Sequence, residues 1–310
     1  VTGKFPIGFF IYNTEEVEVF NQITADVFGT KGEFIGQKNI HSYSNDKYII
    51  EWLRNYYDKN GDKKAYLRMV GTDMQNNRGV FISNGLTNND FKKKLFTIIT
   101  SKNIIETAIY HTVRHVFDET WLNDRDQFLF PNDGWQNDLE FQNDCLAYTL
   151  FNNNIQSQYD ANHWIPFTEY EVNAQAKFES NFMTDFIKGK IKQEVTTTDL
   201  FNSETSPNRV SNPVRALDEN IELQFSEEAT AVFDAGRELW KYYHAQKDVN
   251  VNASLYDIRE YFQGRNDKGR MNSKSDDATY TQLLAELRSK LAILADKIKP
   301  KVYEYGFLKE

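Results

Sequence analysis

The first forty residues carry the apolar pattern of β-strands. A short apolar run at residues 5–12 is typical of a strand that is buried on both faces. Residues 23–28 alternate between apolar and polar positions, and the glycine-containing turn at 29–32 leads into a second extended segment at 33–36. Two extended segments joined by such a turn predict a β-hairpin.

Between residues 44 and 120 the predicted elements alternate between helix and strand. Residues 44–57 have apolar positions at helical spacing, and residues 65–86 predict two strands. Capping residues at 87–90 precede apolar residues at helical intervals, which predicts a helix through residue 99. A second helix is predicted from about Lys102 to Thr120.

The second half of the chain is predicted to be mostly helical, although residues 138–151 mix helical and extended signals and stay open. Thr168, with Glu171 three residues later, has the pattern of a capping box and predicts the start of a long helix. Further helices are predicted to begin at Ser226, Ser254 and Asp276-Asp277, and Lys299-Pro300 is expected to end the last of them.

A polar stretch without apolar periodicity divides the chain and is typical of a linker. The sequence therefore predicts a mixed α+β protein with three parts. Residues 1–190 form a strand-rich mixed α/β region, residues 191–215 are the polar linker, and residues 216–310 form a mostly helical region.

The composition is that of a globular protein with a sizeable core, because 40% of the 310 residues are hydrophobic and 26% are charged. No apolar run approaches the ~20 residues that cross a bilayer, so no membrane partner is expected. The single Cys145 excludes an intrachain disulfide and favours a reducing, cytoplasmic location. The start, Val1 to Phe5, has neither an initiator Met nor a signal-peptide pattern, which suggests a cut inside a longer chain or a removed tag.

The net charge of −9 and the pI of about 5.2 count against nucleic-acid binding by the molecule as a whole. Proteins that bind nucleic acids neutralise phosphates with Lys and Arg. A local basic face can nevertheless coexist with an acidic remainder. Arg265, Lys268 and Arg270 lie in one glycine-flanked loop and form the best such candidate, although Asp267, Asp276 and Asp277 dilute the local field.

Two other basic groups are weaker candidates for contact with DNA. Lys92 and Lys93 belong to a run of three lysines near the start of a predicted helix, where a solvated surface is favoured over phosphate contact. His111 and Arg114 lie on another predicted helix, and His115 shares a face with His111. That pair lacks a third zinc ligand, so packing in the core or a basic face is favoured over a metal site.

Arg125 lies in an irregular segment between Trp121 and Trp135 that is rich in hydrogen-bonding groups. It could read guanine, or it could form a buried network with Asp124 and Asp126, and the network is modestly favoured. The aspartates do not have the paired spacing of a nuclease site.

Several stretches of the chain resemble a group of bacterial N6-adenine-specific DNA methyltransferases, found free-standing or in restriction-modification systems. Together they span nearly the whole chain, and they match the region of that family downstream of its catalytic motifs. The stretches are Phe5-Pro6-Ile7-Gly8-Phe9-Phe10-Ile11-Tyr12-Asn13, Trp121 to Phe128, Pro131 to Trp135, His163 to Thr168, Phe178 to Met183 and Asn252 to Phe262.

The resemblance implies that methyl transfer takes place in a part of the enzyme that precedes these residues. The family binds S-adenosylmethionine on a glycine-containing loop of a doubly wound sheet, and an Asn/Asp-Pro-Pro-Tyr/Phe tetrapeptide binds the flipped adenine. Asn212-Pro213-Val214-Arg215 lacks the second proline and the aromatic residue. We therefore expect no cofactor and no catalytic residue in this chain, S-adenosylmethionine in the missing N-terminal part, and a strand-rich region that continues the missing sheet.

Two functions remain open at this point. The first is the target-recognition and DNA-clamping portion of an adenine-specific methyltransferase, whose partner is double-stranded DNA. The second is a structural module that braces the missing methyltransferase domain or binds a partner subunit. DNA binding predicts retention on duplex that fades as salt rises. Bracing predicts an exposed apolar patch where the missing domain docks.

Overall fold

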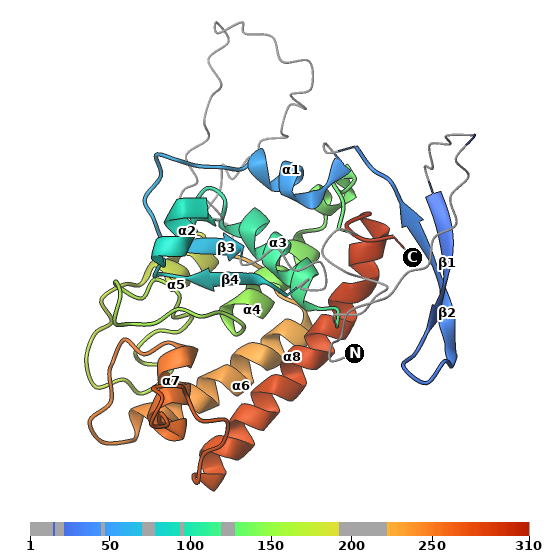
Figure 1. Cartoon of the computed structure of the whole chain (residues 1–310). Helices are drawn as coiled ribbons and strands as arrows, with labels where there is room; N and C mark the ends of the chain where they lie inside the picture. The colour runs from blue at the N-terminus through green and yellow to red at the C-terminus, as the bar shows by residue number, and fades with distance from the viewer. Residues whose placement is uncertain are drawn as a thin grey trace, which may run out of the picture.

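The computed structural model describes residue 15 and residues 22–44, 47–69, 78–93, 96–118, 128–191 and 222–309. Within them the protein is mixed α+β, with two small antiparallel sheets and a larger helical part, as the sequence predicts (Figure 1). The strand expected at 5–12, the linker residues 192–215 and the segment 121–126 lie outside the described residues.

The predicted hairpin is confirmed and stands to one side of the helical body (Figure 1). Strand β1 (Gln22–Phe28) pairs antiparallel with β2 (Phe34–His41). One face is polar, because Thr24 bonds to Asn39 and Gln37 bonds to Asp26 across the strands. Side chains alternate between the faces of a strand, so the cross-strand neighbours Ile23 and Ile40 lie on the opposite face.

A second sheet has the strand order β4-β3-β5 and lies in the body of the protein. Strands β3 (Ala65–Met69) and β4 (Val80–Ser83) confirm the extended segments expected there. The helix expected to reach residue 99 is wrong. Helix α2 (Asn88–Lys93) is short, and residues 96–99 form β5 (Phe96–Ile99). The β-branched residues Thr97, Ile98 and Ile99 favour a strand, and pairing with β3 stabilises it.

Two helices form the centre of the core. Helix α3 (Ile104–His115) confirms the second predicted helix, and α4 (Leu139–Leu150) settles the segment left open by the sequence as helical. They pack against each other and are buried almost all round. The shorter elements α1 (Ile49–Arg54) and the 3-10 turn η3 (Asp133–Asn137) cover them through an edge-to-face cluster of Trp52, Trp135 and Phe307.

The long helix expected at Thr168 is wrong, although its local signal is present. Thr168 and Glu171 make the reciprocal hydrogen bonds of a capping box. The chain then turns instead of continuing, since Asn173 adopts a left-handed backbone with φ of 55°. The next helix is the short α5 (Phe182–Ile187).

The predicted helix starts in the last third are confirmed, and each is capped by a side chain. Ser226 caps α6 (Glu227–His244), Ser254 forms a capping box with Asp257 at α7 (Leu255–Gln263), and Asp277 caps α8 (Ala278–Glu304). Helices α6 and α8 lie side by side along most of their length (Figure 1).

The expectation that Lys299-Pro300 ends the last helix is wrong, since α8 continues through Pro300 to Glu304. A proline inside a helix removes one backbone hydrogen bond. The turns that follow bury Val302, Tyr305 and Phe307 in the core. Burial of these large apolar side chains outweighs the lost hydrogen bond.

Residues on either side of the predicted linker share one hydrophobic core. The segment after α8 pairs with the segment before η3, because Leu129 N–H donates to Phe307 O at 2.8 Å and Asn132 N–H donates to Tyr305 O at 2.8 Å. Lys297 of α8 contacts the buried Asp144 of α4 at 3.0 Å. Burial raises the pKa of Asp144, while bonds from Ser226 and Lys297 oppose that rise.

Candidate nucleic-acid interface

The predicted basic loop joins α7 to α8 and folds into a small ordered hairpin. Gly264 ends α7 with a left-handed φ of 65°, and Arg265 forms a β-bridge with Met271. The tip is a tight turn in which Gly269 N–H donates to Asn266 O at 2.8 Å, with Gly269 at φ 69°. Glycine adopts this conformation without the steric cost of a Cβ.

Arg265 holds the loop in shape. Its guanidinium forms a two-point contact with Glu260, with Nε donating to Oε1 at 2.6 Å and Nη2 donating to Oε2 at 2.8 Å. Nη1 donates to Gly269 O at 2.7 Å. These bonds to Glu260 raise the pKa of Arg265. Arg265 is therefore a positioning residue that ties the tip of the loop to α7.

Lys268 and Arg270 are exposed cations at the tip of the loop. Their backbone N–H groups donate to Asn266 Oδ1, at 3.0 Å from Lys268 and 3.1 Å from Arg270. Among the described residues neither side chain forms an ion pair. The exposed Asp267 directly precedes Lys268 in the sequence. A rigid backbone that carries two unpaired cations is suited to binding an anionic surface.

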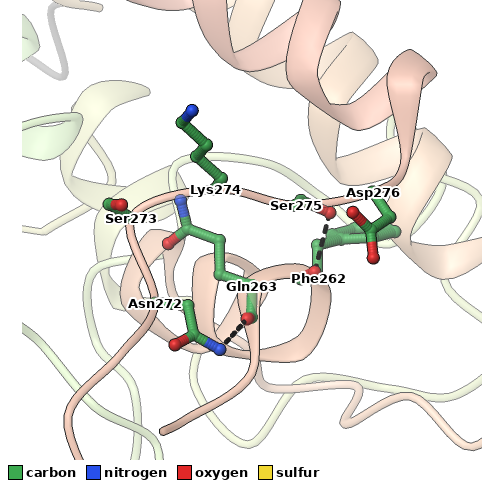
Figure 2. A pocket seen from close by; sticks show the side chains of 7 residues that line it. All are labelled: Phe262, Gln263, Asn272, Ser273, Lys274, Ser275 and Asp276. Atoms are coloured by element: carbon green, nitrogen blue, oxygen red, sulfur yellow. Dashed lines mark hydrogen bonds between the residues drawn. The ribbon is translucent and has the colours of Figure 1, made fainter.

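A polar pocket lies behind this loop, between the end of α7 and the start of α8 (Figure 2). Two side-chain bonds shape it, because Asn272 Nδ2 donates to Gln263 O at 2.9 Å and Ser275 Oγ donates to Phe262 O at 2.7 Å. Its apolar floor is the ring of Phe262, which stacks on Tyr280 with centroids 4.4 Å apart.

Two of the sequence candidates, His111 and Arg114, are buried in α3 and cannot reach DNA in this conformation. His111 is 1% exposed, and its Nδ1 lies 3.2 Å from Thr149 Oγ1. Arg114 is 3% exposed, and its guanidinium lies over the ring of Phe128 at 5.0 Å. His111 and Arg114 are therefore packed in the core and do not form a basic face.

The two histidines of α3 stack on each other inside the core, with ring centroids 4.2 Å apart. Burial lowers the pKa of His111 well below its usual value and lowers that of His115 to about 4. His115 Nε2 lies 2.7 Å from the carbonyl oxygen of Val80, so this nitrogen carries the proton. Among the described residues no group of three His, Cys, Asp or Glu side chains could hold a metal ion.

The remaining candidates are not brought together with the loop in any contact that the structure describes. Lys92 is exposed on α2, and Lys93 is the last residue of that helix. Arg125 lies outside the described residues, so its two interpretations stay open. Of the candidates in the loop, Lys268 and Arg270 are exposed without an ion pair among the described residues, and Arg265 holds the backbone that carries them.

Sequence reasoning missed the pocket behind the loop, and Gln263 and Lys274 in particular. The available signal was a polar residue in the last turn of α7, where the neighbouring Phe262 and Gly264 mark the end of a packed helix. A polar side chain at such a junction either faces solvent or is buried in a polar contact. The sequence alone does not show that Gln263 is buried.

Comparison with protein-family models, curated proteins and solved structures finds no significant match for this chain. The resemblance to adenine-specific methyltransferases therefore stays a prediction. None of the described helices is both long and apolar enough to span a membrane.

Proposed function

We propose that this chain is the DNA-contacting portion of an adenine-specific DNA methyltransferase, and that the loop 264–276 touches the duplex. The observation that carries the proposal is the ordered loop with Lys268 and Arg270 exposed and unpaired among the described residues. Cations on a preformed loop lose little conformational freedom when they bind phosphates. The family resemblance supplies the expectation of a DNA substrate.

The acidic character of the whole chain is compatible with this proposal because some basic side chains form ion pairs with carboxylates and others do not. Many lysines and arginines elsewhere are held by carboxylates, as in the pairs Lys63–Asp160, Arg68–Asp90 and Arg237–Asp234. Lys268 and Arg270 are not. Exposed charges separated by more than about 10 Å are largely screened at 0.1 M salt, so distant acidic groups weaken the loop little.

The test measures duplex affinity as a function of salt for the protein and for the double variant Lys268→Ala/Arg270→Ala. Each phosphate contact contributes about −0.9 to the slope of log K against log salt. The double variant is expected to bind more weakly and to lose about 1.8 from the magnitude of that slope. Arg265 is left in place, because its removal would change the shape of the loop and not only its charge.

Lys177→Ala is the matched control, because Lys177 is an exposed lysine in a different loop. It is expected to leave the affinity and the slope unchanged. If the double variant and Lys177→Ala behave alike, the loop does not contact DNA. If the unaltered protein shows no salt-sensitive duplex binding, the proposed function is wrong.

A second candidate function, bracing a neighbouring domain, is favoured by the exposed hairpin. Phe28, Phe34 and Ile35 at its tip are 57–58% exposed, and Ile23 and Ile40 are each 40% exposed. A two-stranded sheet is marginally stable by itself, and clustered exposed apolar side chains mark surfaces that another chain covers. This surface is what the bracing hypothesis requires.

Hydrogen exchange separates the two functions. If the hairpin docks on a methyltransferase domain, the amides of β1 and β2 exchange more slowly in the longer enzyme than in this chain. Amides of α3, which are buried in the core, should exchange equally in both and serve as the internal control. Equal exchange of β1 and β2 in both proteins would exclude docking at the hairpin.

A further inference from the structure

The pocket behind the loop 264–276 contains a buried hydrogen-bond acceptor without a partner. Gln263 is 8% exposed, and its Oε1 has no hydrogen-bond partner among the described residues. The side-chain amide of Gln263 stands on the wall of the pocket, beside the chain of residues 273–275 (Figure 2). The loop is held through the backbone oxygen of Gln263, so its side chain is not needed for that bond.

Three other polar side chains around the pocket also lack hydrogen-bond partners among the described residues. Ser273, Lys274 and Asp276 line it, are exposed, and have no side-chain hydrogen bond or ion pair within the part of the chain that the structure describes. The pocket thus offers a hydroxyl, an ammonium, a carboxylate and an amide in a volume of about 400 Å³. Ser275 and Asn272 shape the walls.

The mixture of charges restricts the ligand class. A free anion would meet the Asp276 carboxylate, and a metal ion would meet the Lys274 ammonium with only one carboxylate to hold it. A neutral group that carries both hydrogen-bond donors and acceptors can pair with the polar side chains of the pocket. It brings no like charge close to Asp276 or Lys274. The edge of a nucleobase is such a group, and Gln and Asp are the side chains that accept from the amino groups of adenine and cytosine.

We propose that this pocket receives the edge of a base that carries an exocyclic amino group, with Gln263 accepting the hydrogen bond from the one amino hydrogen that base pairing leaves free. Rotation about the last bond of the Gln263 side chain, which is soft, turns Oε1 toward the pocket. The inference rests on the proposed DNA contact and assigns to it a residue that reads sequence, whereas Lys268 and Arg270 only position the backbone.

The first experiment uses the variant Gln263→Leu. Leucine has a similar size and removes the unpaired buried oxygen, so the melting temperature is expected to stay the same or rise. Binding selection from a randomised duplex pool, followed by sequencing, then compares base preference. We expect a preference for adenine or cytosine at one position with the unaltered protein and none at that position with Gln263→Leu. Gln282→Leu, at an exposed position of α8, is the control and keeps the preference.

A second experiment changes the DNA and does not depend on how a variant folds. In the preferred duplex, the selected base is replaced by its analogue without the amino group, purine for adenine or pyrimidin-2-one for cytosine. The unaltered protein is expected to bind the analogue about tenfold more weakly, the lower part of the range for a specific base contact. Gln263→Leu is expected to bind both duplexes equally.

The outcomes separate this inference from the proposed function. Salt-sensitive duplex binding whose base preference is unchanged by Gln263→Leu overturns the base-reading pocket and leaves the DNA contact in place. Equal binding of the base and its analogue by the unaltered protein does the same. Absence of duplex binding by the unaltered protein overturns both. Loss of the preference together with the loss of discrimination against the analogue supports the assignment.

Discussion

Helix α3 and the loop 264–276 both carry clustered basic residues, and the structure uses them in opposite ways. Arg114 and His111 lie inside the core, where aromatic rings and hydroxyls surround them. Lys268 and Arg270 lie on an ordered turn that exposes them. Residue type and clustering are alike in the two regions. The position of the element in the fold decides whether a basic side chain is buried in the core or exposed at the surface.

Replacing one cation in each region should give the largest difference between them. Arg114→Ala removes a buried side chain and its contact with the ring of Phe128, so we expect a loss of about 3 kcal/mol in the free energy of unfolding. Lys268→Ala should change it by no more than about 0.5 kcal/mol. Urea denaturation of both variants measures the contrast, and equal losses would mean that the two regions do not differ in this way.

The buried histidines should make the stability of the α3 region depend on pH. In the unfolded chain each histidine takes up a proton near pH 6.5. In the folded protein burial lowers the pKa of both, to about 4 for His115. The stabilisation is therefore complete above pH 6.5 and is lost as the pH falls toward 4, by up to about 1.4 kcal/mol per pH unit for each histidine.

This pH dependence can be measured by urea denaturation between pH 7.5 and 5.5 for the protein and for His111→Gln/His115→Gln. The double variant is less stable at pH 7.5 but should lose less on acidification. A variant whose stability falls as steeply as that of the unaltered protein would show that other groups control the response. Lys268→Ala, in the other region, should retain the full pH dependence.

The smallest expected effect tests whether the loop is held in a fixed shape. Gly269 has a φ of 69° and open space where a Cβ would lie. Gly269→Ala should therefore cost about 1 kcal/mol through backbone strain alone. Gly36→Ala is the control, because Gly36 also has open space but an ordinary φ. If both variants have the same stability, the turn at the tip relaxes freely and the loop is not preformed.

Local signals allowed much of the fold to be predicted from the sequence. Ser226, Ser254 and Asp277 cap their helices by bonds that span three residues, so neighbouring residues suffice to identify them. The errors arose where distant contacts decide. Residues 96–99 form a strand because they pair with β3. Helix α8 continues through Pro300 because the residues after it pack in the core.

The candidate site was predictable only in part for the same reason. The loop with Lys268 and Arg270 follows from its glycines and its place between two helices. The burial of Arg114 depends on α4 and on Phe128, which the sequence pattern of α3 does not identify. The apolar residues on every side of α3 nevertheless indicated that this helix lies in the core. Gln263 becomes a candidate only when its unpaired oxygen is located in three dimensions.

The pairing of residues 305–307 with residues 129–132 has a consequence for synthesis in the cell. Phe307 and Leu308 fill the same core as Trp52 and Trp135, which are translated long before them. Translation proceeds at about 5–20 residues per second, so the earlier aromatic residues wait many seconds without their partners. Closure of this core must therefore follow the emergence of residues 305–308 from the ribosome.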